Sequence, residues 1–188
     1  MTIAVNGEPA SRVAIVTGGS RGVGRATAHR LAAGDYAVVV NYLHDRRAAE
    51  AAVEAMLASQ GDVMAVRADV ADELDVQRLF AETMTAFGRV DVVVHAVNSR
   101  SAEMVIREAV RHLRDGGAIV SLSSAAKALP RLAVELRGRD ITVNGVSLLP
   151  DQPCVSERVA DVIAYLVSSH GHRFTGQVFR VGEAGLPP

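Results

Sequence analysis

Short runs rich in valine, isoleucine and alanine alternate with longer segments of helical apolar spacing from Arg12 onward. This alternation is typical of parallel strands joined by crossover helices. It predicts seven strands, at residues 13–17, 37–41, 63–67, 90–95, 118–122, 141–147 and 177–181. It also predicts helices at residues 24–33, 46–59, 73–87, 102–114 and 156–168, with a shorter one from about 130 to 136. The expected fold class is α/β, a doubly wound and mainly parallel seven-stranded sheet with helices on both faces.

The length of 188 residues fits one domain with a substantial core. Hydrophobic residues make up 49% and charged residues 22% of the chain, a balance that argues against disorder. Residues 1–10 carry no periodic pattern. We therefore expect a loose leader at 1–10, followed by a single domain over 11–188.

The charges are nearly balanced, with 20 Lys and Arg against 21 Asp and Glu and a net charge of -1. No overall field favours nucleic acid or an anionic membrane as a partner. No apolar run is long enough to span a bilayer, and the first residues lack a signal-peptide pattern. The single cysteine, Cys154, cannot form an internal disulfide, and no zinc-type cluster can be assembled around it. We expect a cytoplasmic protein without a metal.

The most specific functional signal is the segment Thr-Gly-Gly-Ser-Arg-Gly-Val-Gly at 17–24, between the first predicted strand and its helix. Its glycines allow a tight turn and close approach of the backbone to a pyrophosphate, while the helix N-terminus directs N–H groups at the anion. Simple turn punctuation is the alternative, but the strand-loop-helix context favours a Rossmann-type dinucleotide site. The residues predicted to bind the cofactor here are Gly18, Ser20, Arg21, Gly22, Val23 and Gly24.

The T-G-x-x-x-G-x-G spacing resembles the short-chain dehydrogenase/reductase family. Other segments that resemble the family lie at residues 39–42, 68–70, 87–91, 116–124, 141–144 and 174–178. The resemblance implies that Asp69 and Val70 belong to the segment that contacts adenine. It also places Ala96 at the cofactor, in the segment His95-Ala96-Val97-Asn98 that replaces the family's Asn-Asn-Ala-Gly.

The choice of dinucleotide depends on the end of the second predicted strand, where an acidic side chain would accept from the ribose 2′-OH of NAD and repel a 2′-phosphate. That strand ends in Asn41 and Tyr42, which carry no charge at neutral pH. Arg21 could supply the positive charge that a 2′-phosphate needs, with further candidates at His44, Arg46 and Arg47. We predict NADP(H) over NAD(H). The alternative is that these arginines are only solvated surface charges.

The family resemblance implies hydride transfer between nicotinamide and a carbonyl or alcohol, with a Ser-Tyr-Lys set handling the proton. Ser124 matches the family serine, but neither the tyrosine expected about a dozen residues later nor its lysine is present. The three tyrosines of the chain, at 36, 42 and 165, fall in segments assigned elsewhere. Lys127 is the only lysine and is a second candidate, although a solvated loop charge explains it as well.

His95 is the third catalytic candidate, because a side chain at the carboxyl end of a central strand lies where open α/β sheets bind ligands. Histidine titrates near neutrality and could replace the missing acid. We favour the alternative, in which His95 packs beside the adenosine or caps the strand. Cys154 has no nearby basic partner in sequence and is expected to be an incidental thiol.

Two functions follow. The first is an NADP(H)-dependent oxidoreductase of reduced size that acts on a small-molecule carbonyl or alcohol. The second is a catalytically silent dinucleotide-binding protein that serves as a sensor, scaffold or partner subunit. We also expect a homo-oligomer, because the family resemblance implies subunit contacts through the last strand, which is intact at residues 178–181.

Overall fold

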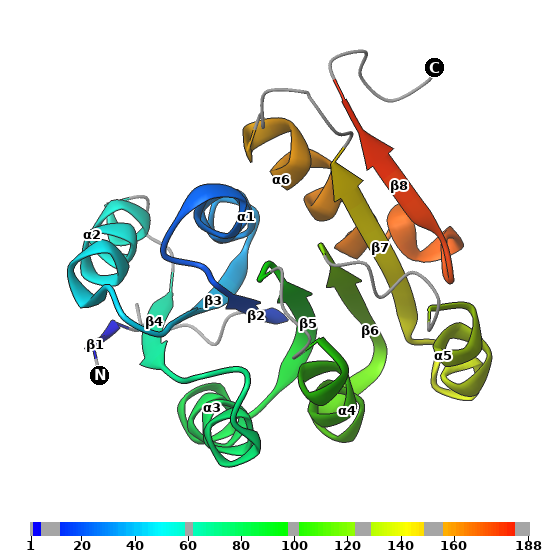
Figure 1. Ribbon diagram of the computed structural model, residues 1–188, viewed down its shortest axis with the longest axis horizontal. Helices are drawn as coiled ribbons and strands as arrows, with labels where there is room; N and C mark the ends of the chain where they lie inside the picture. The colour runs from blue at the N-terminus through cyan, green and yellow to red at the C-terminus, as the bar shows by residue number, and fades with distance from the viewer. Residues whose placement is uncertain are drawn as a thin grey trace.

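One sheet of eight strands runs through the computed structural model, which describes residues 2–4, 12–58, 62–97, 102–122, 129–148 and 156–182 (Figure 1). The strands are β1 (Thr2–Ala4), β2 (Arg12–Thr17), β3 (Tyr36–Tyr42), β4 (Val63–Arg67), β5 (Val90–His95), β6 (Leu113–Ser121), β7 (Thr142–Leu148) and β8 (Val178–Val181). The helices are α1 (Gly22–Ala32), α2 (Arg46–Leu57), α3 (Glu73–Phe87), α4 (Ala102–His112), α5 (Leu129–Glu135) and α6 (Ser156–Val167), with short 3₁₀ turns η2 (Arg137–Arg139) and η3 (Gly171–Arg173).

The strand order is β1-β4-β3-β2-β5-β6-β7-β8, and every pair from β4 to β8 is parallel. All seven predicted strands are present, which confirms the doubly wound α/β class. β2 lies between β3 and β5. The strands β3 and β4 are therefore added on one side of β2, and β5 to β8 on the other, which makes β2 the point where the strand order reverses. The carboxyl ends of β2 and β5 therefore border the crevice in which open α/β sheets bind their ligands.

The first strand is a correction to the sequence prediction. Residues 1–10 were expected to be a loose leader, yet Thr2–Ala4 form β1 and pair antiparallel with β4 in the register Thr2 to Ala65. Without β1, β4 would present unpaired N–H and C=O groups at the edge of the sheet. A strand of three residues is too short to show an alternating pattern, and its formation depends on a partner more than 50 residues away.

β6 differs from its predicted range of 118–122 mainly at its start, and it ends one residue earlier, at Ser121. It begins at Leu113 rather than 118, immediately after α4 ends at His112. Leu113 pairs with Val90, and the register then shifts between Val90 and Val92. This early pairing arises from a neighbouring strand and leaves no mark in the local spacing of apolar residues.

Helices cover both faces of the sheet (Figure 1). One core contains apolar side chains of α1, α2 and α6, including Leu31, Met56 and Ile163. The other contains side chains of α3, α4 and α5, including Phe80 and Ile106. The central strands are buried on both sides, as expected for a parallel sheet. None of the helices in the described part of the chain combines the length and the apolar character needed to cross a membrane.

Candidate functional site

The loop from β2 to α1 forms the centre of the site. Its predicted residues lie between the end of β2 and the first turn of α1. Arg21, the residue before the helix, is extended at φ -146° and makes no side-chain cap. The first N–H groups of α1 therefore lack a capping side chain, which is the arrangement that lets a helix N-terminus bind an anion.

Glycine is required at two positions of this loop for different structural reasons, one a close backbone contact and the other a positive φ angle. A Cβ atom on Gly24 would lie 2.2 Å from the carbonyl oxygen of Gly18, so the loop can fold back on the helix only without a side chain. Gly22 has φ +49°, and a Cβ there would meet no atom within 4 Å. The space over Gly22 is thus open to a ligand, and the residues present fit the pyrophosphate of a dinucleotide.

Arg21 forms an ion pair with Asp45, the residue that precedes α2. The second carboxylate oxygen of Asp45 accepts from the Ala48 N–H at 2.9 Å and caps that helix. The Ala48 N–H and then the Arg21 guanidinium lower the pKa of Asp45 below its usual value. Arg21 remains 68% exposed, so its guanidinium is accessible to solvent although it is paired. Of the other predicted cations, Arg46 pairs with Glu50 along α2.

The Asn41 side chain is held by backbone groups of two neighbouring segments. It is 2% exposed and hydrogen-bonds to the backbone, accepting from the Gly18 N–H and donating to the Ala68 carbonyl oxygen. A contact between Asn41 and the cofactor therefore stays a prediction, while the structure shows this side chain bonded to two neighbouring segments. Tyr42, the next residue, is half-buried.

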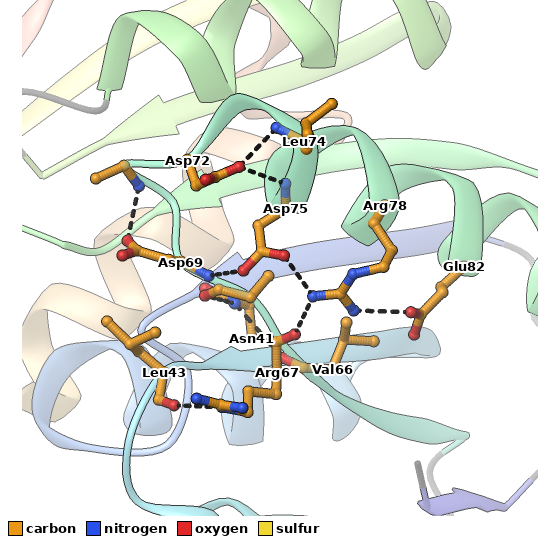
Figure 2. Close-up of polar contacts among 12 residues, drawn as sticks. Asn41, Leu43, Val66, Arg67, Asp69, Asp72, Leu74, Asp75, Arg78 and Glu82 are labelled. Atoms are coloured by element: carbon orange, nitrogen blue, oxygen red, sulfur yellow. Dashed lines mark hydrogen bonds and ion pairs between the residues drawn. The ribbon is translucent and has the colours of Figure 1, made fainter.

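The turn between β4 and α3 holds Asp69 and Val70, the predicted adenine segment (Figure 2). Asp75 of α3 accepts from the Asp69 N–H at 2.8 Å, and Arg78 bonds both Asp75 and the carbonyl oxygen of Arg67. The Asp69 N–H, followed by Arg78, lowers the pKa of Asp75. These contacts fix the turn from the side of α3.

His95 is completely buried at the end of β5, paired in register with Thr17 of β2. Its Nδ1 lies 3.0 Å from the Thr17 hydroxyl, which accepts from the Ala96 N–H at 3.2 Å. Burial lowers the pKa of His95 to about 4, so the imidazole is neutral at pH 7. These features argue against a proton donor and favour the interpretation in which His95 joins the strand ends. Its Nε2 has no hydrogen-bond partner among the described residues.

Ser124 and Lys127, the other two catalytic candidates, and Cys154 lie outside the described residues. Within the described ranges, no group of three or more His, Cys, Asp or Glu side chains is arranged to hold a metal ion. The sequence reasoning missed Asp45, Asp75 and Thr17. Asp45 could have been found, because an aspartate directly before a helical pattern is a capping signal.

The fold and the loop define a doubly wound, nucleotide-binding class of protein. The family model described as short chain dehydrogenase matches residues 12–99. Versicolorin reductase 1 of Aspergillus parasiticus is 39% identical over 148 residues, which cover 65% of this chain and 56% of that protein. Versicolorin reductase stcU of Emericella nidulans is 33% identical over 178 residues, which cover 72% of this chain and 67% of that protein.

Among solved structures, a short chain dehydrogenase from Burkholderia cenocepacia J2315 in complex with NADP superposes with a TM-score of 0.82 at 26% identity. The match covers 91% of this chain and 96% of that one. The chain belongs to the short-chain dehydrogenase/reductase family, which confirms the resemblance found in its motifs. It spans little more than half the length of the Aspergillus relative.

Proposed function

We propose that this chain binds NADP(H) at the β2–α1 loop and acts as an oxidoreductase that transfers a hydride between nicotinamide and a carbonyl or alcohol of a small molecule. The observation that carries the proposal is the loop itself, where α1 begins without a side-chain cap beside open space over Gly22. The position of the loop at the crevice of the sheet adds support. So do the family membership and the reductase names of the relatives.

The preference for NADP(H) rests on the charges around the loop. Asn41 carries no charge at the end of β3, so no acidic side chain there repels a 2′-phosphate. Arg21 presents a planar guanidinium with five N–H donors, enough to bind a phosphate while it still touches Asp45. The Arg21–Asp45 pair is then the element that sets how strongly the phosphate is favoured.

A bound nicotinamide would supply or accept the hydride, and the chain would orient it and manage the proton. Ser124 remains our predicted hydrogen-bond donor to the substrate oxygen, with Lys127 or water as the source of the proton. His95 is left out of this assignment because its imidazole is neutral and buried. Losing one general acid typically costs two to four orders of magnitude in rate rather than all activity.

The test is a titration of the purified chain with NADPH and NADH, followed by nicotinamide fluorescence, with thermal shifts for NADP⁺ and NAD⁺. We expect tighter binding of the phosphorylated forms and measurable NADPH oxidation with some member of a broad carbonyl panel. Firm binding with no turnover over the whole panel would overturn the oxidoreductase in favour of a silent dinucleotide-binding protein. No binding of any form would overturn both.

A further inference from the structure

The Asn41 side chain lies between the β2–α1 loop, to which the proposed function assigns the cofactor, and the β4–α3 turn, which is predicted to contact the adenine. Asn41 is the sixth residue of β3, which runs between β2 and β4, and its register partner on β4 is Val66. The β2–α1 loop leaves the sheet on one side of β3 and the β4–α3 turn on the other. A side chain at this position can reach the backbone of both.

The carboxamide of Asn41 uses both of its ends. Its Oδ1 accepts from the Gly18 N–H at 3.4 Å, in the β2–α1 loop. Its Nδ2 donates to the Ala68 carbonyl oxygen at 2.9 Å and lies 3.4 Å from the Val66 carbonyl oxygen, on the β4 side (Figure 2). The Asn41 carbonyl oxygen also accepts from the Gly19 N–H at 3.0 Å, so main chain and side chain both hold the loop.

The β4–α3 turn has few other ties to the sheet at this point. The Ala68 N–H donates to the Tyr42 carbonyl oxygen at 2.9 Å, and the Arg67 side chain donates to the Leu43 carbonyl oxygen at 3.1 Å. Further contacts come from α3, through Asp75 and Arg78 (Figure 2). Asn41 is the side chain that joins this turn to the glycine-rich loop. Asn41 is buried, so water cannot reach the backbone groups that it bonds. Removing the carboxamide would leave those N–H and C=O groups without a hydrogen-bond partner, which costs free energy.

We propose that Asn41 is a positioning residue that sets the separation between the pyrophosphate-binding loop and the adenine-contacting turn, so that both halves of the adenosine pyrophosphate bind at once. The inference rests on the proposed function, since it assigns those loops to a dinucleotide. Residue 41 therefore acts on affinity for every dinucleotide and does not read the 2′ group, although it stands at the strand end where an acidic residue typically does.

Two substitutions separate these roles. Asn41→Leu keeps the size of the side chain and removes every hydrogen bond from it. Asn41→Asp keeps an acceptor for the Gly18 N–H but turns a carboxylate oxygen toward the carbonyl oxygens of Val66 and Ala68, where a donor is needed. If residue 41 read the ribose directly, Asn41→Asp would shift preference toward NAD⁺.

Asn144→Leu is the matched control. Asn144 is completely buried in β7, and its side chain also bridges backbone groups, donating to the Phe174 carbonyl oxygen at 2.7 Å and accepting from the Gln177 N–H at 3.2 Å. Those groups precede β8, at the end of the sheet opposite the cofactor loops. The control therefore loses comparable hydrogen bonds away from the β2–α1 loop and the β4–α3 turn.

The experiment measures dissociation constants of NADP⁺, NAD⁺, adenosine and inorganic pyrophosphate, with melting temperatures, for the full chain and each variant. We expect both Asn41 variants to weaken NADP⁺ and NAD⁺ by a similar factor of about ten, which corresponds to about 1.4 kcal/mol. The two fragments, which each use one loop, should weaken by less than about threefold. Asn144→Leu should lower the melting temperature without changing dinucleotide affinity.

A selective gain for NAD⁺ in Asn41→Asp would overturn the inference, as would equal losses for the fragments and the whole dinucleotide. Unchanged affinity in both variants would also overturn it. If Asn41→Leu does not fold, Asn41→Ser carries the same comparison, because its short hydroxyl cannot bridge both loops. Failure of the unsubstituted chain to bind either dinucleotide would count against the proposed function, whereas binding that ignores Asn41 counts against this inference alone.

Discussion

Arg21 and Asp45 form an ion pair that joins the glycine-rich loop to the start of α2. The pair lies beyond the end of β3, where the 2′ position of a bound dinucleotide is expected. Asp45 also caps α2 through its other oxygen. One carboxylate thus stabilises a helix and competes with any phosphate for the same guanidinium.

We predict that Asp45→Asn tightens the binding of NADP⁺ by about fivefold and leaves NAD⁺ nearly unchanged. Asparagine keeps the cap to the Ala48 N–H while removing the negative charge, and an interaction between exposed charges has only a modest effect. The measurement is the ratio of the two dissociation constants at low salt. Asp161→Asn, which breaks the exposed pair with Arg30, is the control. A ratio that does not move would remove Asp45 from cofactor selection.

Arg21→Gln should have the opposite effect. It removes the only described cation within the glycine-rich loop, so NADP⁺ should bind about tenfold more weakly while NAD⁺ changes little. The preference should also become less sensitive to salt, because exposed charges are screened. Arg25→Gln, on the exposed surface of α1, is the control. Equal losses for both dinucleotides would mean that Arg21 shapes the loop and does not bind the phosphate.

Gly24→Ala should abolish dinucleotide binding and destabilise the fold by about 1 to 3 kcal/mol, because the new Cβ would lie 2.2 Å from the Gly18 oxygen. Gly22→Ala should cost about 1 to 2 kcal/mol through its left-handed backbone alone. Gly138→Ala, in η2, meets neither obstacle and should be close to neutral. Urea unfolding and cofactor titration of the three variants check this order. A Gly24→Ala protein with normal affinity would contradict the packing described for the loop.

Burial of His95 makes stability depend on pH. The pKa of His95 is about 4 in the folded chain and about 6.5 when unfolded, so the unfolded state binds the proton first as the pH falls. The free energy of unfolding should therefore drop by up to about 1.4 kcal/mol per pH unit between about 6.5 and 4. His95→Asn should flatten that slope, while His29→Asn, at an exposed position on α1, should not. Identical slopes in all three proteins would show that His95 is not buried in the neutral form.

We propose that two copies of the chain associate through β8. This strand forms an edge of the sheet (Figure 1) and carries Val178 at 40% exposure. Phe179 of the same strand contacts the exposed ring of Phe174, which in turn lies beside the exposed ring of Tyr165. Exposed apolar side chains beside an open strand edge mark a surface that favours association. Sedimentation should give twice the mass of one chain, and Val178→Lys should give the mass of one. A single-chain mass for the unsubstituted protein would overturn the proposal.

Local patterns were enough to predict most of the fold. Each of the seven predicted strands and the longer helices reflects a spacing of apolar residues within a few turns or a few residues, so its signal is contained in one segment. The glycine-rich loop was predictable for the same reason. β1 and the early start of β6 depend on pairing with other strands, so the local spacing of apolar residues does not predict them.

The roles of individual site residues were harder to predict, because they depend on what surrounds each side chain. A contact of Asn41 with the cofactor stays a prediction, but no local pattern indicated that the register of β3 with β4 would place its amide against the Ala68 carbonyl oxygen. His95 was a catalytic candidate until its complete burial lowered its pKa. The capping role of Asp45 was not predicted, but it could have been, because an aspartate directly before a helical pattern is a capping signal.

The short strand β1 affects how many copies of the chain could associate through the edges of the sheet. Residues 2–4 pair with β4, so the backbone N–H and C=O groups of β4 on that side are not free to pair with another molecule. Among the described strands, β8 is the longer of the two edge strands and is the one we propose a second copy to meet. When β8 of one subunit pairs with β8 of a second subunit, the two form a closed dimer with twofold symmetry. In such a dimer the β8 edge is no longer available to a third subunit. Under the proposed association through β8, the arrangement of the strands therefore favours a closed dimer over a filament.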